Sequence, residues 1–259
     1  MSSGLRTQVG QLARRSVIRT LRQPAQFVPS LIFPLFLLAV NSGGLKDATN
    51  LPGFPTDSYL TFALAITFMQ GALFSVINSG TDLARDIETG FLNRMALTPL
   101  RGAALLTGLL AGAIVLGVVQ GVVYLLVGLT FGVEVSAGVG GALVIVLLSV
   151  AVTTAFGTIG MFAALRTGSG EAVQGLFPVF FVFLFLSAGS LPLDLIQTSW
   201  FHTVAEINPV TYLLEAFRSL LSEGWVIGQL ALGFGIAAAL FAIGMGAAAS
   251  ALKTRLVRT

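Results

Sequence analysis

The chain has 259 residues, of which 55% are apolar and only 10% are charged. Soluble domains carry about 25% charged residues, so this composition excludes a soluble enzyme, a disordered regulator and a nucleic-acid-binding protein, and it predicts a bundle of membrane helices. The chain has no cysteine and one histidine, which excludes disulfides, cysteine nucleophiles and multi-histidine metal sites. No cofactor, metal or nucleic acid is therefore expected.

Residues 1–24 are predicted to form an amphipathic helix. At helical spacing, apolar residues share one face and basic residues share the other. The apolar face carries Leu5, Val9, Leu12, Ala13 and Val17, and the basic face carries Arg14, Arg15, Arg19 and Arg22. Such a helix lies in the membrane interface rather than across it. Gln23 followed by Pro24 ends the helix and turns the chain into the bilayer.

Six apolar stretches follow, which predicts an all-α polytopic membrane protein with six transmembrane helices. A membrane helix needs about 20 predominantly apolar residues. The stretches cover residues 26–40, 58–79, 103–131, 139–165, 172–188 and 226–252. No soluble domain fits between them, so residues 1–259 are predicted to form a single transmembrane domain.

Lysine and arginine are distributed unevenly among the connections. Twelve of the 14 fall in the N-terminal segment, the 81–101 loop, the loop after residue 165 and the C-terminal tail, which leaves only Lys46 and Arg218 on the other side. Basic residues are enriched in cytoplasmic loops. Both termini are therefore predicted to be cytoplasmic, which requires an even number of spans, in a cell (inner or plasma) membrane.

Uncharged polar and small residues mark two of the spans. Thr67, Gln70, Gly71, Ser75 and Asn78 share one side of the 58–79 stretch. The 103–131 stretch contains Gly108-x-x-x-Gly112 and Gly117-x-x-x-Gly121, a spacing that lets helices approach closely. Two interpretations stay open for Gln70, Ser75 and Asn78: ordinary helix packing, or the lining of a substrate path. No span has a clearly central charged residue, which argues against a charge-relay pump.

The loop at residues 81–101 carries an unusual pattern for a simple connection. Leu83, Ile87 and Phe91 recur every four residues, which predicts a short amphipathic helix. Acidic residues cluster in the first half of the loop (Asp82, Asp86 and Glu88), and Arg94 and Arg101 follow. An apolar stripe edged by mixed charges favours docking to another protein.

The 172–188 stretch is rich in phenylalanine. It contains Phe177, Phe180, Phe181, Phe183 and Phe185 together with Pro178. Contact with membrane lipid is one interpretation, and a hydrophobic dimer seam or substrate wall is the other.

A short helix is predicted in the outer loop at residues 189–224. Asn208 and Pro209 form an N-cap and first-turn pair. Apolar residues recur at helical spacing after this pair, and Glu215, Arg218 and Ser222 fall on the other face. About 13 residues give roughly 20 Å, which is too short to span a bilayer. A re-entrant or outer-interface helix is therefore predicted.

The sequence argues against two enzyme classes, P-loop ATPases and serine hydrolases. A P-loop requires Gly-Lys-Ser/Thr, but the only lysines, Lys46 and Lys253, each follow a leucine. The chain is therefore not an ATPase of that type. A serine hydrolase dyad would need Ser169 close to His202, and the predicted topology puts them on opposite sides of the membrane.

The 81–101 loop resembles that of ABC-2-type permeases, the membrane subunits of ATP-driven exporters. The shared pattern is an acidic pair around a variable residue, then glycine, an apolar-rich turn and Thr-Pro. Here it reads Asp86-Ile87-Glu88-Thr89-Gly90-Phe91-Leu92-Asn93-Arg94-Met95, followed by Thr98-Pro99. The stretch from Asn208 to Arg218 resembles the second signature of the family, before the last span. The closest similarity is to daunorubicin-resistance-type drug exporter permeases. Ile87 stands where a basic residue is common, and Phe91 where threonine is usual.

The resemblance implies a half-transporter that pairs with a second permease copy, as a homodimer or heterodimer, and binds a cytoplasmic ABC ATPase subunit. The residues it assigns to ATPase coupling are Asp86, Glu88, Gly90, Phe91 and Arg94. The implied function is export of hydrophobic drug-like or lipid compounds. Three alternatives stay open: an ABC-2-type exporter of polysaccharide or lipid-linked glycan, an ATPase-independent channel or assembly factor, and an integral membrane enzyme.

Overall fold

The computed structural model describes residues 5–96 and 102–257. This part of the chain is all-helical, without a β-strand. The first half contains α1 (Leu5–Arg22), α2 (Pro24–Gly44), η1 (Lys46–Asn50), α3 (Tyr59–Glu88), α4 (Phe91–Ala96) and α5 (Gly102–Thr130). The second half contains α6 (Gly138–Thr167), α7 (Gly170–Gln174), α8 (Phe177–Phe185), η2 (Leu193–Leu195), α9 (Ser199–Ile207), α10 (Pro209–Arg218), η3 (Ser219–Glu223) and α11 (Ile227–Val257).

Five of the described helices are long and apolar enough to cross a membrane: α2, α3, α5, α6 and α11. They coincide with five of the six predicted stretches. The remaining stretch, 172–188, is split into α7 and α8. Pro178 lies in the first turn of α8, and because proline has no N–H it cannot donate to the carbonyl of Gln174 one turn earlier. The sixth crossing therefore stays a prediction.

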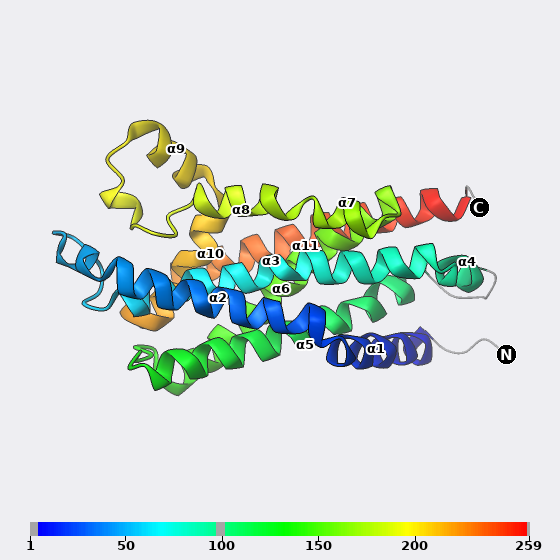
Figure 1. Ribbon diagram of the computed structural model, residues 1–259, viewed down its shortest axis with the longest axis horizontal. Coiled ribbons are helices and arrows are strands. Elements are labelled where there is room, and N and C mark those ends of the chain that lie inside the picture. The colour runs from blue at the N-terminus through cyan, green and yellow to red at the C-terminus, as the bar shows by residue number, and fades with distance from the viewer. Residues whose placement is uncertain (1–4, 97–101, 258–259) are drawn as a thin grey trace.

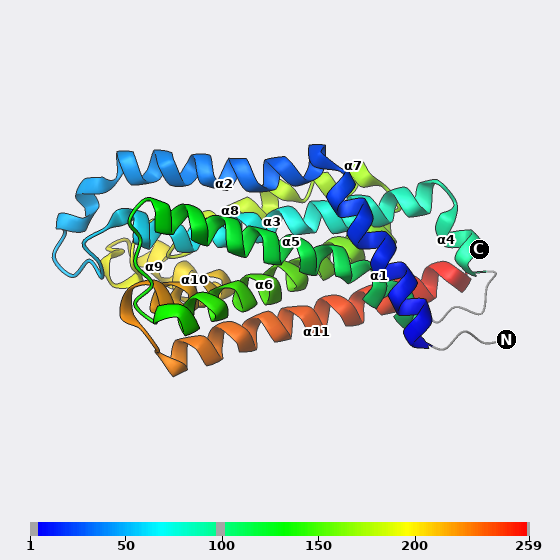
Figure 2. The same cartoon turned by 90° about the horizontal axis from the view of Figure 1, so that it is seen from below.

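Helix α3 forms the centre of the bundle, between α2 and α8 on one side and α5 and α6 on the other (Figures 1 and 2). Residues 61–73 of α3 are all buried. Tyr124 of α5 and Leu148 of α6 belong to the same core. By contrast, α2 and α11 expose large apolar side chains such as Ile32, Phe36 and Ile243, which is the surface expected of helices that face lipid.

The two glycine pairs of α5 pack closely against two different helices. A Cβ at Gly108 would collide with Leu12 of α1, and one at Gly112 would lie 2.7 Å from Ser16 Oγ. A Cβ at Gly117 would lie 2.8 Å from the Cα of Val150 in α6. The predicted role of these glycines in close helix packing is therefore confirmed.

The two ends of the bundle differ in composition. At one end lie α1, α4 and the C-terminal ends of α3, α6 and α11 (Figure 1). We call it the basic end, because these segments carry the described members of the twelve-residue basic set. The end that holds η1, α9 and α10 is called the opposite end.

The structure corrects the predicted boundaries of the 81–101 loop. Residues 81–88 continue α3 without a break, and the separate helix is α4, which has only six residues. Leu83 and Ile87 therefore belong to α3, whereas Phe91 begins α4. The helix ends here because Gly90 adopts a positive φ of 67°, a conformation that glycine accepts without steric cost. Thr98 and Pro99 lie outside the described residues.

Candidate functional site

A buried carboxylate, that of Asp86 in the last turn of α3, lies at the basic end. Its side chain is 5% exposed. Arg15 of α1 donates from Nη1 to Oδ2 at 2.8 Å and from Nη2 to Oδ1 at 2.7 Å, a bidentate pair. Arg19, one turn further along α1, donates to Asp86 Oδ1 at 2.9 Å, and its Nε lies 3.0 Å from Asp82 Oδ1. We call these two arginines and two aspartates the α1–α3 charge cluster.

The cluster corrects the predicted orientation of α1. The arginines were predicted to share a polar face, and Arg14 and Arg22 are indeed exposed. Arg15 and Arg19 instead reach toward α3, because Ser16 between them is buried and donates to the carbonyl of Leu109 in α5. A buried carboxylate needs such cationic partners. The hydrogen bonds from Arg15 to Asp86 also raise the pKa of the Arg15 guanidinium. Placement of α1 in a membrane interface stays a prediction.

Helix α4 contacts the same cluster. The ring of Phe91 lies 4.0 Å from the Arg15 guanidinium carbon, a cation–π contact. Gly90 forms the bend between α3 and α4. Arg94 is exposed and donates from Nη1 to the carbonyl of Thr89 at 3.2 Å. Three predicted coupling residues, Asp86, Phe91 and Gly90, are therefore brought to one junction.

Glu88, another predicted coupling residue, contacts the segment that follows α6. Its Oε1 accepts a hydrogen bond from the backbone N–H of Gly170, the first residue of α7, at 3.2 Å. The side chain stays exposed. Glu88 therefore links the end of α3 to the interrupted α7–α8 segment, whereas Asp86 links it to α1.

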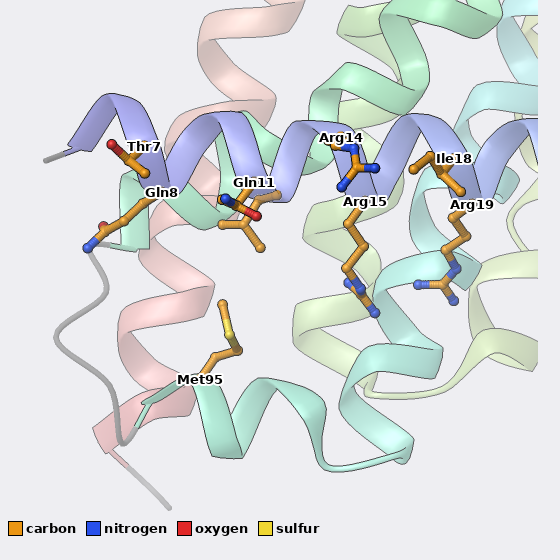
Figure 3. Close-up of a pocket in the computed structure, with 9 residues that line it drawn as sticks. Thr7, Gln8, Gln11, Arg14, Arg15, Ile18, Arg19 and Met95 are labelled. Carbon is orange, nitrogen blue, oxygen red and sulfur yellow. The ribbon is translucent and has the colours of Figure 1, made fainter. Parts of the chain in front are cut away.

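A groove of about 860 Å³ separates α1 from α4. Figure 3 shows that Arg15 and Arg19 extend from α1 on the side of this space, and that Met95 extends from α4. Leu12 and Ile18 add apolar surface, and Thr7, Gln8, Gln11 and Arg14 complete the lining. The groove therefore combines arginine side chains with an apolar floor.

The polar residues of the central helix are enclosed in the protein. Gln70 and Ser75 are buried, and Asn78 is half-buried. Gln70 Oε1 and Ser75 Oγ are among the buried side-chain atoms of the described residues that lack a hydrogen-bond partner. Neither faces an outer surface, so this geometry favours the packing interpretation. A path along them would require the helices to separate.

The second predicted motif caps two helix ends at once. Asn208 accepts from the N–H of Val210 at 3.0 Å, which confirms it as the N-cap of α10, and Pro209 lies in the first turn. The Asn208 amide also donates to the carbonyls of Phe183 and Leu186, at 2.7 and 3.0 Å. These carbonyls belong to the C-terminal end of α8, where the intrahelical donors run out.

Arg218 was predicted to lie on the polar face of this helix, and that placement is wrong. It is only 3% exposed. Its guanidinium donates to the carbonyls of Ala188 and Gly189, each at 2.7 Å, and to Glu215 Oε1 at 2.8 Å. The guanidinium carbon also lies 3.6 Å from the centre of the Phe62 ring. Backbone carbonyls after α8 therefore bind the guanidinium that helical spacing placed on the face opposite the apolar residues.

Sequence reasoning missed Arg15 and Arg19 as members of the site. Their partner Asp86 lies 71 and 67 residues away, and no local spacing connects them. One signal was present: a helix rich in arginine and a short acidic run were both predicted on the same side of the membrane. Oppositely charged side chains that lie on the same side of the membrane are candidates for ion pairs.

Comparison with known proteins identifies the family. A sequence profile described as "ABC-2 type transporter" matches residues 7–222. A protein of Cyanophora paradoxa described as "Putative transport permease ycf38" is 26% identical over 84% of this chain and 76% of its own length. A protein of Porphyra purpurea with the same description is 26% identical over 96% of this chain and 90% of its own length. The chain therefore belongs to the ABC-2 type transporter family, whose members are multi-pass transport permeases rather than enzymes.

Proposed function

We propose that the chain is the membrane-spanning subunit of an ATP-driven exporter of hydrophobic drug-like or lipid compounds. Permeases of this family usually work with an ATPase partner. Since neither lysine of the chain stands in a P-loop, ATP hydrolysis belongs to a separate subunit. The observation that carries the proposal is the α1–α3 charge cluster beside the α1–α4 groove, because it joins an exposed docking surface to a central helix of the bundle.

The basic end faces the cytoplasm in this proposal. The support is the distribution of lysine and arginine, since the basic end carries α1, α4 and the basic C-terminal turns of α6 and α11. Both termini then lie on the side where ATP is available. The membrane is the cell (inner or plasma) membrane.

Force from the ATPase subunit has two routes into the bundle. The ATPase contacts α4 and the groove, with the exposed Arg94 as a contact residue. Displacement of α4 about Gly90 then reaches α1 through Phe91 and Arg15, whereas displacement of the end of α3 reaches α7 through Glu88. Such a displacement shifts the permease between states only if the ATPase binds one state more tightly than the other.

A second permease copy covers the face formed by α2 and α8. Between α7 and α8 the Leu176 N–H donates to the carbonyl of Val173, three residues earlier, and Pro178 has no N–H to donate to the carbonyl of Gln174. Backbone of this kind is tolerated at membrane depth only when it is buried in protein or lines a water-filled cavity. Phe36 of α2 and Phe185 of α8 are also exposed on their helices. Pairing of two copies here supplies both the cover and a path between them.

The test is reconstitution with a candidate ABC ATPase subunit. The two proteins should co-purify, and transport in liposomes should require both. Arg94→Glu should abolish co-purification, whereas Arg166→Glu, an exposed arginine at the end of α6, should leave it intact. Full transport by the permease alone, without an ATPase, contradicts the proposal.

A further inference from the structure

Helix α7, at the basic end (Figure 1), is attached to the bundle by few buried side chains. It has five residues, Gly170–Gln174, and of these only Val173 is buried. Its first turn is closed by its own cap, since Ser169 Oγ accepts from the N–H of Ala172 at 3.4 Å. Segments with few buried apolar contacts open locally at a small fraction of the global unfolding free energy. The structure therefore makes α7 much easier to detach than the fully packed α3.

The one buried side chain of α7 enters a socket formed by two glycines. Val173 has no exposed surface. A Cβ at Gly80 of α3 would collide with Val173 Cγ1, and it would lie 2.8 Å from the carbonyl oxygen of Gly160 in α6. Glycine at residue 80 therefore leaves the room that Val173 occupies. We call this arrangement the Val173 socket, and it fixes α7 against α3 and α6 at one point.

Both ends of α7 interrupt the regular helix. Gly168, between α6 and α7, has a positive φ of 72°, which glycine accepts without steric cost. At the other end, Pro178 has no N–H for the carbonyl of Gln174. The first joint is held from α11, because Arg255 donates from Nη1 to the carbonyl of Leu165 at 3.0 Å. Helix α7 is therefore a short segment between two joints, and the joint at Gly168 is fixed in place.

The same helix forms one wall of a polar cavity of about 470 Å³. The other walls come from α3 and from Gln26 of α2. Glu88, in the α3 wall, accepts the hydrogen bond from the Gly170 N–H described above, and this contact is exposed. Movement of α7 away from α3 therefore breaks one exposed hydrogen bond, empties the Val173 socket and opens the cavity.

We propose that α7 is a strap that undocks from α3 during the transport cycle. Val173 leaves its socket, α7 turns about Gly168, and the cavity between α3 and α7 opens at the basic end. Displacement of the end of α3, which reaches α7 through Glu88, is the event that releases the strap. The proposal rests on the proposed function for its place in the transport cycle, but not for undocking itself.

The first measurement is hydrogen exchange of the α7 amides in the full-length permease in nanodiscs, without ATP or ATPase. Val173→Ala removes two buried methyl groups from the socket, so the α7 amides should exchange about tenfold faster. The matched control is Val152→Ala, a buried valine of α6, which should leave α7 exchange unchanged. Equal α7 exchange in the two variants overturns the proposal.

The second measurement locks the strap with a disulfide. The chain has no cysteine, so an introduced pair has no competitor. A Cβ at Gly170 would lie 4.0 Å from the Cβ of Ala84 in α3, within the range of disulfides, about 3.5–4.5 Å. When the pair Ala84→Cys with Gly170→Cys is oxidised, α7 exchange should slow. Transport in liposomes with the ATPase subunit should be lost, and a reductant should restore it.

The controls separate the lock from the chemistry used to form it. Each single-cysteine variant, treated with the same oxidant, should transport normally. The ATPase subunit should still bind the oxidised pair, because α4 and the α1–α4 groove are not cross-linked. Full transport by the oxidised pair overturns the proposal. If the cysteine-free chain does not transport with the ATPase either, the proposed function fails, and the exchange comparison still decides whether α7 undocks at the Val173 socket.

Discussion

Both ends of the bundle bury an ion pair, but the partners come from different distances. At the basic end, Asp86 of α3 is held by Arg15 and Arg19 of α1, 71 and 67 residues away. At the opposite end, Arg218 is held by Glu215 of its own helix and by the carbonyls of Ala188 and Gly189. The first pair joins two helices through side chains, whereas the second fixes a helix to backbone.

The pKa values of the two arginines are also shifted in opposite directions. The hydrogen bonds that Arg15 donates to Asp86 raise the pKa of Arg15, whose side chain is 37% exposed. Burial lowers the pKa of Arg218, and Glu215 only partly opposes that effect. Arg15 and Arg19 hold Asp86 through flexible side chains of another helix, whereas Arg218 is enclosed by the backbone carbonyls of Ala188 and Gly189. We therefore interpret Arg218 as structural and the α1–α3 charge cluster as the moving junction.

The largest effect is expected at Arg218. Arg218→Met keeps much of the side-chain volume but leaves two carbonyls and Glu215 without their donor. The free energy of unfolding should fall by about 3–5 kcal/mol, measured by denaturant titration in mixed micelles. The matched control is Arg166→Met, an exposed arginine, which should change stability little. If the two variants are equally stable, the structural role of Arg218 is refuted.

The next effect is expected at Asp86 and has two readouts. Asp86→Asn should cost about 2 kcal/mol of stability, less than a fully enclosed pair because water reaches Arg15. The variant should also bind the ATPase subunit normally while ATP hydrolysis no longer drives transport. Folded Arg218→Met protein should keep the wild-type ratio of transport to hydrolysis.

The control for Asp86 is Asp57→Asn, an exposed aspartate at the opposite end of α3. It should leave both stability and the ratio of transport to hydrolysis at wild-type values. A normal ratio in Asp86→Asn would contradict the interpretation of the charge cluster as the moving junction.

The contrast also explains what the sequence could predict. Hydropathy located five long helices, and the glycine spacing of α5 located its packing faces, because these signals are local. The N-cap role of Asn208 was likewise readable from the next residue, Pro209. The burial of Arg218 was not, because its partners are backbone carbonyls, which every residue has. The pairing of Arg15 with Asp86 was not predicted either, since α1 and α3 meet only in the folded bundle.

A smaller effect is expected at the bend between α3 and α4. Gly90→Ala places a Cβ on a residue with a φ of 67°, which costs about 1 kcal/mol. The strain favours a different α3–α4 angle, so ATPase binding should weaken by several-fold, measured by titration of the ATPase subunit. Gly43→Ala on α2 is the matched control, because its Cβ would meet no atom within 4 Å and its φ is ordinary. Equal affinities of the two variants would show that the bend angle does not set ATPase binding.

The smallest effect is expected at Phe91, where threonine is usual in the family pattern. Phe91→Leu keeps an apolar side chain but removes the aromatic ring that makes the cation–π contact with Arg15. Since Arg15 is partly exposed, the contact is worth only about 0.5 kcal/mol, and stability should change by no more than this. A double-mutant cycle with Arg15→Gln isolates the contact from the loss of each side chain. A coupling energy near zero would show that α4 reaches α1 without the ring. A measurable coupling energy would show that the Phe91 ring links α4 to the α1–α3 charge cluster.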